Sequence, residues 1–181
     1  MNNLLFLTGA SGSGKTATIE KLEKDFVGTI AFIHTDDFGV PSPEEMVRLY
    51  GGGDGYQRHI FKHWIDFCKS HLMKSSAIVI EGSFKPSIII EGCDHEHILD
   101  YKVLLFDCDD ATRVERLHRR GHPDIATPDM MNYAQILRTE AGDNNIPIID
   151  TTKLTLSDTS NKVISSLQLH PSGKRGKDYD F

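Results

Sequence analysis

Residues 9 to 16 read Gly-Ala-Ser-Gly-Ser-Gly-Lys-Thr and match the pattern G-x-x-x-x-G-K-[ST] at every defining position. Glycine lets a backbone take positive φ angles and approach a ligand without a Cβ atom in between. Successive amide groups then converge on one hollow at the positive end of a helix dipole, where phosphate oxygens are stabilised. The pattern places Lys15 to reach the β- and γ-phosphates and the Thr16 hydroxyl to bind Mg²⁺.

We therefore expect this loop to bind a nucleoside triphosphate together with Mg²⁺. The alternative is a glycine-rich turn that binds no ligand. The expected binding residues are Gly9, Ala10, Ser11, Gly12, Ser13, Gly14, Lys15 and Thr16. The flanking segments favour binding, because Leu4–Leu7 is an apolar run typical of a buried strand and Thr16–Asp25 has apolar residues at helical spacing.

Apolar runs and helical patterns alternate along the rest of the chain. Strands are predicted at Thr29–His34, Ala77–Gly82, Tyr101–Asp107 and Ile146–Asp150. Helices are predicted from Pro43 with Ser42 as N-cap, over Tyr56–Met73, over Asp109–Arg119, after the cap Thr127, and over Leu156–Leu169 with Ser157 or Asp158 at its start. This alternation is typical of an α/β fold with a parallel sheet covered by helices on both faces.

Two segments are harder to interpret. Residues 51–55 (Gly-Gly-Gly-Asp-Gly) are expected to be too flexible for a regular element, and residues 87–90 fit either a strand or a helix packed on the sheet. Residues 1–169 are expected to form one domain. Residues 170–181, which are polar and rich in Gly and Lys, are expected to form a tail.

Composition narrows the function classes. The 181 residues carry a formal net charge of -6, which disfavours a broad nucleic-acid-binding face. No apolar run is long enough to span a bilayer, and no signal peptide is expected before the first strand. Three cysteines without paired metal spacing are interpreted as buried, reduced thiols. We expect a cytoplasmic protein, monomeric or homodimeric, with no membrane partner and no nucleic-acid partner.

Carboxylates follow two of the predicted strands at the edge where ligands bind in parallel sheets. Asp36 and Asp37 come after the second strand, and Glu81 ends the third. One aspartate is expected to accept or orient the proton of an attacking hydroxyl group, and Asp36 or Glu81 to help hold the metal with Thr16. Strand-end carboxylates also cap turns and helices, so a structural role is the alternative.

Arginine residues gather before the turn at Gly121. Phosphoryl transfer spreads negative charge over the γ-phosphate oxygens, and guanidinium groups that close over them stabilise it. We expect a mobile lid from this group, with a solvated basic face as the alternative for any single member. The residues are Arg113, Arg116, Arg119 and Arg120, with Arg138 on the following helix.

Two weaker patterns lie on the predicted helix over Tyr56–Met73. Tyr56, Gln57 and Arg58 adjoin the glycine cluster and are candidates for contacting a second substrate. His59 and His63 have the i, i+4 spacing of metal ligands, but without a nearby third ligand a polar helix face is the preferred interpretation.

Together these motifs resemble the P-loop small-molecule kinases, a group that includes gluconate kinase, adenylylsulfate kinase, chloramphenicol phosphotransferase, nucleoside kinases and zeta toxins. The resemblance rests on the loop, "HTDDF", "IVIEG" and "RVERLHRRG". The segments "EGSFKPSII", "GHPDIATPDMMNYAQILRTEA" and "IPIIDTT" further resemble bacterial AAA_33-type ATP-binding proteins. Glu81 is followed by glycine instead of forming an acidic pair, a departure that argues against a motor-type ATPase.

The resemblance implies a P-loop NTPase fold with a five-stranded parallel sheet in the order 2-3-1-4-5 and an arginine-bearing lid. It implies catalytic roles for Lys15, Asp36 or Asp37, Arg116, Arg120 and Arg138. It also places Arg113, Asp150, Thr151 and Thr152 near the nucleotide. The function implied is an ATP-dependent phosphotransferase acting on a hydroxyl group of a small molecule such as a nucleoside, nucleotide, sugar or antibiotic. Two alternatives remain, a nucleotide-binding sensor without catalysis and a kinase of nucleic-acid ends.

Overall fold

The structure is a computed structural model of the chain, and it describes residues 3–27, 29–71 and 75–167. The last residues of the predicted helix over Tyr56–Met73 and the predicted tail at 170–181 lie outside these ranges. None of the helices in the described residues has the length and apolar character that crossing a membrane requires.

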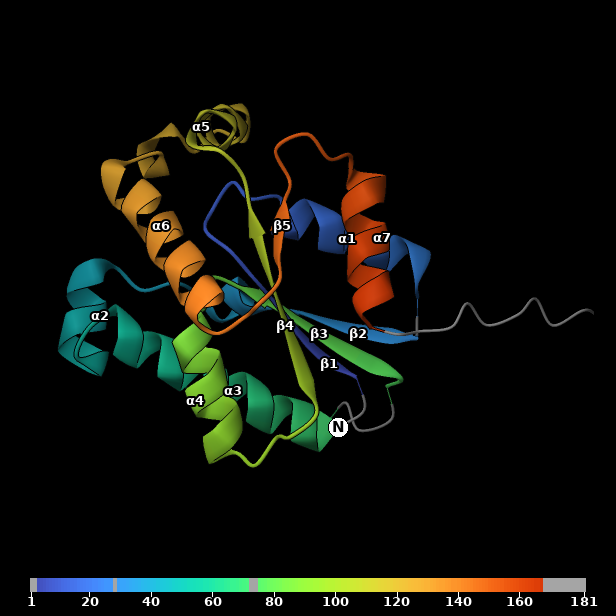
Figure 1. Ribbon diagram of the computed structural model, residues 1–181. Helices are drawn as coiled ribbons and strands as arrows, with labels where there is room; N and C mark the ends of the chain where they lie inside the picture. The colour runs from blue at the N-terminus through green and yellow to red at the C-terminus, as the bar shows by residue number, and fades with distance from the viewer. Residues whose placement is uncertain (1–2, 28, 72–74, 168–181) are drawn as a thin grey trace, which may run out of the picture.

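Five parallel strands form a single sheet in the order β2-β3-β1-β4-β5, which confirms the expected topology (Figure 1). The strands are β1 Leu4–Thr8, β2 Ile30–His34, β3 Ala77–Gly82, β4 Tyr101–Asp107 and β5 Ile148–Asp150. Every residue of the central strand β1 is buried, as its unbroken apolar run predicts. The loop that follows β1 therefore starts from the middle of the sheet.

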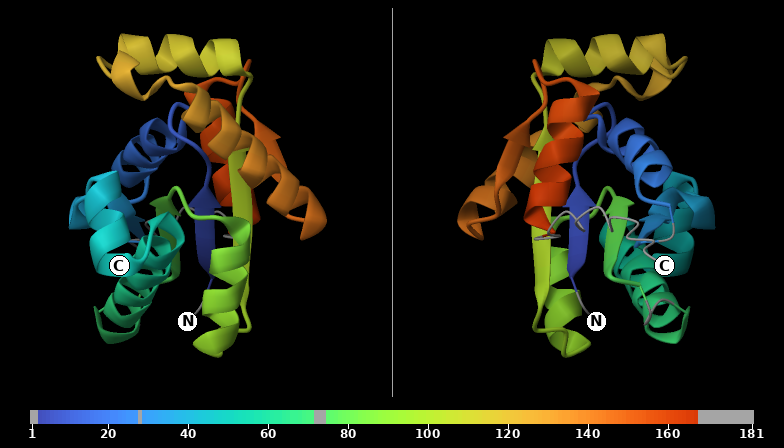
Figure 2. Two further views of the ribbon diagram at one scale, coloured as in Figure 1. Left: turned by 90° about the vertical axis from the view of Figure 1, so that its left-hand side faces the viewer. Right: turned by 90° about the vertical axis from the view of Figure 1, so that its right-hand side faces the viewer.

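Helices cover both faces of the sheet. The helices are α1 Lys15–Asp25, α2 Pro43–Tyr50, α3 Gly53–His71, α4 Pro86–His95, α5 Asp110–Arg119, α6 Pro128–Asp143 and α7 Leu156–Ser166, with short 3-10 turns at Thr35–Phe38 and Pro123–Ile125. Helices α1 and α7 pack against one face, α3 and α4 against the other, and α6 packs beside β4. Helix α5 crosses above the carboxyl ends of the strands (Figure 2). That placement brings its side chains to the edge where the glycine loop lies.

Helix boundaries largely follow the predicted caps. Ser42 and Thr127 cap α2 and α6 through their side chains, as expected. Helix α7 is capped by Thr155 with Asp158 as its reciprocal partner, so the predicted caps Ser157 and Asp158 were placed too late in the chain. The ambiguous residues 87–90 belong to the helix α4, which begins at Pro86.

The expectation of an irregular segment was wrong for residues 53–55, which begin α3, whereas Gly51 and Gly52 lie outside the helices. Gly51 takes a left-handed conformation that ends α2, and α3 begins two residues later at Gly53. A Cβ atom on Gly55 would lie 1.8 Å from the carbonyl oxygen of Tyr50. Glycine is thus required at this position because the two helices approach closely.

Asp107, the last residue of β4, connects the glycine loop to two helices. Its carboxylate accepts a hydrogen bond from Arg113 on α5 at 2.6 Å and another from Arg138 on α6. Arg113 is fully buried, and its guanidinium also donates to the carbonyl oxygen of Ser11 in the loop at 2.8 Å. A buried guanidinium needs such a partner, because an unpaired buried charge is costly.

We expect Asp107→Asn to lower the free energy of unfolding by about 3 kcal/mol, because it removes the negative partner of a buried cation. Asp66→Asn is the matched control. Asp66 pairs with Lys62 where both side chains are more than half exposed, so its loss should cost less than about 0.5 kcal/mol. Chemical denaturation of both variants measures the difference. Equal losses of unfolding free energy in the two variants would show that the buried ion pair stabilises the protein no more than the exposed one.

The cysteines of the chain are free and buried, as predicted. Burial raises the pKa of the Cys68 and Cys93 thiols to about 12, and it also raises the pKa of Cys108. Because the thiolate is the reactive form, we expect the native protein to react very slowly with a disulfide reagent at pH 8. Cys68 and Cys93 should hold about 1,000-fold less thiolate than at their ordinary pKa of 9.0. Denatured protein should titrate three thiols, and rapid labelling of the native protein would contradict the described burial.

Candidate active site

The loop between β1 and α1 is built from backbone conformations that only glycine takes without strain. Gly9, Gly12 and Gly14 have φ angles of 152°, 81° and 94°. A Cβ atom on Gly9 would lie 2.3 Å from the carbonyl oxygen of Phe106, and one on Gly12 would lie 2.9 Å from the side chain of Arg113. Glycine is therefore required by conformation at all three positions, and at Gly9 and Gly12 also by lack of space.

Lys15 and Thr16, at the start of α1, face the end of β3. The Lys15 ammonium group donates to the carbonyl oxygen of Gly9 at 2.8 Å and lies 3.7 Å from Glu81 Oε1. The Thr16 hydroxyl donates to the same Glu81 oxygen at 3.4 Å. Burial lowers the pKa of Lys15 from its usual range, although Glu81 and Asp36 oppose that change. A lysine, a hydroxyl group and a carboxylate thus meet beside the loop.

His34, the last residue of β2, fixes Glu81 from the opposite side. Its Nδ1 atom lies 3.0 Å from Glu81 Oε2, and its Nε2 atom lies 3.2 Å from a carboxylate oxygen of Glu23 on α1. The hydrogen bond to Glu81 raises the pKa of His34 to about 9 against the opposing effect of burial. Burial acts to raise the pKa of Glu81, but the His34 hydrogen bond and the Lys15 charge outweigh it and lower that pKa. Glu81 is therefore held as a carboxylate.

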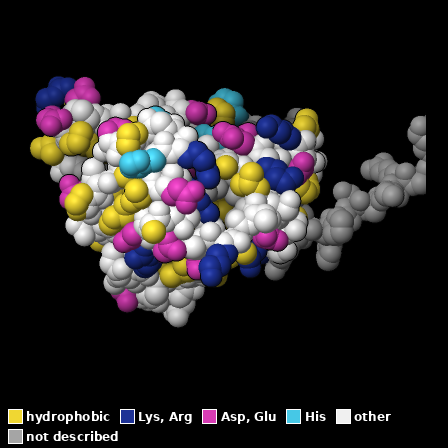
Figure 3. Space-filling model, turned by 90° about the horizontal axis from the view of Figure 1, so that it is seen from above, with side chains coloured by type: hydrophobic (Ala, Val, Ile, Leu, Met, Phe, Trp, Pro, Cys, Tyr) yellow, Lys and Arg dark blue, Asp and Glu magenta, His cyan; other side chains and the backbone are white. Residues whose placement is uncertain are grey.

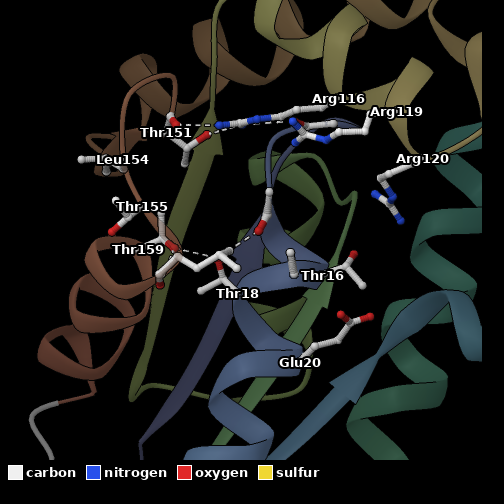
Figure 4. Close-up of a pocket in the computed structure, with 14 residues that line it drawn as sticks. Thr16, Thr18, Glu20, Arg116, Arg119, Arg120, Thr151, Leu154, Thr155 and Thr159 are labelled. Atoms are coloured by element: carbon white, nitrogen blue, oxygen red, sulfur yellow. Dashed lines mark hydrogen bonds between the residues drawn. The ribbon is translucent and has the colours of Figure 1, made fainter.

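A first cavity of about 430 Å³ opens on the α1 side of the loop (Figure 4). Thr16 and Glu20 of α1 lie below it, and Arg116, Arg119 and Arg120 approach from α5 (Figure 4). The segment from Thr151 to Thr159 forms the remaining wall. The cavity thus combines loop backbone, cationic side chains and a neutral wall that includes Leu154 and Leu156.

The arginines predicted to act together are divided among different environments. Arg116 donates to the carbonyl oxygens of Gly12 and Thr151, and Arg120 is exposed at the cavity. Arg113 is buried, with its guanidinium contacting Asp107 and the loop as described above. Arg138 binds Asp107 and lies in a separate hollow with Lys153. The structure therefore brings Arg116 and Arg120 to the first cavity, and not Arg113 or Arg138. The lid remains an expectation.

The three residues of the predicted nucleotide-binding segment, which begins at the last residue of β5, also lie in different places. Thr151 lines the first cavity and donates from its hydroxyl to the carbonyl oxygen of Ser13 at 2.8 Å. Asp150 and Thr152 lie in the hollow that contains Arg138. Thus only the middle residue of this predicted nucleotide-binding segment reaches both the loop and the cavity.

A second cavity of about 360 Å³ lies on the other side of the loop. Ser11 of the loop, Asp36 and residues of α3 and α6 line it. Asp36 is exposed as a whole residue. Partial burial of its carboxyl group and the negative charge of the nearby Glu81 raise its pKa. Asp37 is also exposed but lines neither cavity. The structure therefore distinguishes between the two adjacent aspartates.

Of the three residues proposed to contact a second substrate, two line the second cavity and one does not. Tyr56 and Gln57 line the second cavity, whereas Arg58 forms an exposed ion pair with Glu91. Tyr133 on α6, which the sequence interpretation did not include, closes the cavity by donating to the carbonyl oxygen of Ser83 and accepting from Gln57. The only sequence signal for Tyr133 is the helical periodicity of α6, in which every third or fourth residue faces the sheet.

His34 is the other site residue that the sequence interpretation missed. It stands in the segment "HTDDF", two residues before the predicted Asp36. Its relevance comes from strand pairing, since the parallel register places His34 directly opposite Glu81. His59 and His63 lie beside the ring of Phe38, and the described residues contain no group of three or more His, Cys, Asp or Glu side chains that could hold a metal ion.

The surface above the carboxyl ends of the strands is mixed in charge. Lysine and arginine side chains are interspersed there with acidic and hydrophobic ones, without a continuous basic area on this face (Figure 3). A polyanion such as nucleic acid binds through an extended basic surface. This face therefore gives no support to recognition of a long nucleic acid.

Comparison with known proteins places the fold among the small-molecule kinases with a P-loop. The shikimate kinase of Acinetobacter baumannii in complex with shikimate is similar with a TM-score of 0.60 and 16% identity, over 94% of this chain and 97% of that one. The gluconokinase of Sinorhizobium meliloti 1021 has a TM-score of 0.57 and 17% identity, over 91% of both chains. The tunicamycin resistance protein of Deinococcus radiodurans has a TM-score of 0.64 and 16% identity, over 94% and 98%.

No protein-family model and no curated protein sequence matches the chain. The narrower resemblance to AAA_33-type proteins thus rests only on the motifs quoted for it. At these identities the solved structures establish the fold, and they leave the acceptor open. The chain has the five-stranded P-loop fold of the small-molecule kinases.

Proposed function

We propose that this protein is an ATP-dependent phosphotransferase that moves the γ-phosphoryl group to a hydroxyl group of a small molecule. One observation carries the proposal: the loop separates two cavities of different chemistry. The first presents Arg116 and Arg120, which suit phosphates, and the second presents the carboxylate of Asp36, which suits a hydroxyl group. A donor and an acceptor can thus meet at the loop from opposite sides.

Each site residue has a role in this reaction. A hydroxyl oxygen of the acceptor bonds to the γ-phosphorus while the bond to the bridging oxygen of the departing diphosphate breaks. Asp36 receives the hydroxyl proton, and its raised pKa improves it as a base. Lys15, the loop amides and Arg116 stabilise the charge on the phosphate oxygens. Arg120 is assigned the role of closing over these oxygens and excluding water.

The oxygen atoms of Thr16 and Glu81 fit a magnesium ion. Mg²⁺ prefers oxygen ligands, keeps several of its waters and is bound through one or two carboxylates together with substrate phosphates. The Thr16 hydroxyl and a buried carboxylate with a lowered pKa lie 3.4 Å apart at the start of α1. Bound there, Mg²⁺ supplies positive charge to the phosphate oxygens. Asp36 is assigned to the acceptor instead, because it lines the second cavity.

A nucleotide-binding sensor is the second candidate, and the ordered contacts of Arg116 with the loop are compatible with it. A sensor needs no cavity for an acceptor, so the cavity beside Asp36 favours the kinase. The mixed surface disfavours a kinase of nucleic-acid ends. The cytoplasmic location and the monomeric or homodimeric state expected from the sequence belong to the same proposal.

Gly12→Ala tests the nucleotide site. The new Cβ atom would lie 2.9 Å from Arg113, so we expect nucleotide affinity to fall at least ten-fold and stability to fall by about 1–3 kcal/mol beyond the conformational cost. Gly51→Ala is the control, because its φ of 75° is similar and no atom lies within 4 Å of the added Cβ. It should lose about 1 kcal/mol and keep its affinity. Titration calorimetry with Mg–ATP and thermal denaturation measure both, and equal affinities would contradict the assigned site.

Asp36→Asn tests the proposed base. Removing a positioned general base costs about 100-fold or more in rate, whereas Asp37→Asn should change kcat less than about three-fold because Asp37 lines neither cavity. Transfer of labelled γ-phosphate to a panel of alcohols, nucleosides and sugars measures the rates, with Lys15→Ala as the inactive reference. Nucleotide binding that depends on Lys15 without transfer to any acceptor would favour the sensor. Equal loss in both aspartate variants would contradict the role given to Asp36.

A further inference from the structure

The walls of the second cavity are mainly apolar. Six aliphatic, thioether and aromatic side chains line it, and Tyr56 and Tyr133 add two phenol rings. The six are Val40, Met46, Ile60, Phe84, Ile125 and Met130. Among the described residues that line this cavity, none is a lysine or an arginine. A ligand that fills it therefore gains contact with apolar surface and meets no cation in the lining.

Basic residues near the cavity in sequence have partners elsewhere. Lys85 follows the lining residue Phe84, and its ammonium group pairs with Asp54 at 2.8 Å. Arg58 follows Gln57 and pairs with Glu91 on α4. Lys15 is buried against the carbonyl oxygens of the loop and beside Glu81, as described above. Each of these three cations thus has a carboxylate within 4 Å.

The side chains of Gln57 and Tyr133, two neutral polar residues of the cavity lining, are joined to each other and to the backbone by hydrogen bonds. Gln57 accepts a hydrogen bond from the backbone amide of Lys85 at 2.8 Å and donates to the Tyr133 hydroxyl at 2.9 Å. Tyr133 in turn donates to the carbonyl oxygen of Ser83. Among the hydrogen bonds and ion pairs of the described residues, the Asp36 carboxylate takes part in none. It is the acceptor group left available to a ligand.

We propose that the phosphoryl acceptor is an alcohol without an anionic group, held by a compact apolar body. This inference rests on the proposed kinase function and specifies its substrate class. A carboxylate or phosphate on the acceptor would be transferred from water to an apolar cavity, would find no cation there and would be repelled by Asp36. A neutral alcohol with an apolar body is favoured instead, because its hydroxyl group can donate to the Asp36 carboxylate and its apolar atoms can contact the apolar lining.

The size of the cavity limits the acceptor further. Small-molecule sites usually enclose about 300–1,000 Å³, and this cavity has about 360 Å³. An acceptor of one or two rings matches that volume. Polyhydroxy acids such as shikimate and gluconate, which are anions at neutral pH, match neither the charge nor the apolar lining.

Four alcohols, tested as acceptors, distinguish the effect of a negative charge from the effect of polarity on phosphoryl transfer. 1-Phenylethanol and mandelate share a phenyl ring and a hydroxyl group, and they differ in a methyl group against a carboxylate. Glucose and gluconate form the corresponding polar pair. With the full chain and Mg–ATP, we expect kcat/KM for 1-phenylethanol to exceed that for mandelate and for glucose at least ten-fold, measured by transfer of labelled phosphate. Gluconate should be the poorest acceptor.

A second measurement places a cation in the cavity. Met46→Arg adds a guanidinium group from α2, and the expected result is a rise of at least ten-fold in the mandelate to 1-phenylethanol ratio of kcat/KM. Val47→Arg is the matched control. Val47 is the next residue on the same helix, is 67% exposed and does not line the cavity, so the ratio should change less than two-fold.

Each result decides the proposal. Preference for mandelate or gluconate by the unchanged chain would overturn it while leaving the kinase function intact, and so would absence of transfer to both neutral alcohols while anionic acceptors are phosphorylated. Equal effects of the two arginine variants would show that this cavity does not receive the acceptor. Binding of Mg–ATP without transfer to any alcohol at all would instead overturn the kinase function on which the inference rests.

Discussion

A buried guanidinium group holds the site together. Arg113 lies between the glycine loop and the end of β4, where Asp107 compensates its charge and the carbonyl oxygens of Ser11 and Cys108 accept hydrogen bonds from it. Because Asp107 also binds Arg138, one carboxylate sets the positions of the loop, α5 and α6. The orientation of Arg116 toward the first cavity then follows, since it lies one turn further along a helix whose first turn is fixed.

Both strands that flank β1 carry a carboxylate at their last or next-to-last residue, and the two carboxylates have different neighbours. Glu81 of β3 faces Lys15 and Thr16, the residues proposed to bind phosphate and magnesium. Asp107 of β4 faces arginines that belong to the scaffold. The difference arises from what packs above each strand: the start of α1 lies beside β3, whereas the arginines of α5 and α6 reach the end of β4. Strand-end acids of similar appearance thus acquire separate roles through their neighbours.

The sequence alone predicted those parts of the molecule whose structure is determined by neighbouring residues in the chain. Loop residues 9–16, the caps Ser42 and Thr127 and the apolar strands each carry their own signal, and the alternation of elements with the resemblance to kinases predicted the sheet order. Partners brought together by pairing were not predictable. His34 meets Glu81 only through the register of β2 on β3. Arg113 and Arg116 share a helix face, yet their burial differs because one lies under the loop and the other beside it.

Helix α2 is attached to the molecule in an unusual way for an element that borders a cavity. None of its eight residues, all of which the structure describes, is buried, and it leans on α3 through Met46 and Tyr50. Mutations there cost little folding energy, because few core contacts are lost. Natural variation can therefore alter this helix freely while the sheet and loop stay unchanged. Under the proposed function, related chains could diverge in what they phosphorylate through this one helix, whose Met46 lines the second cavity.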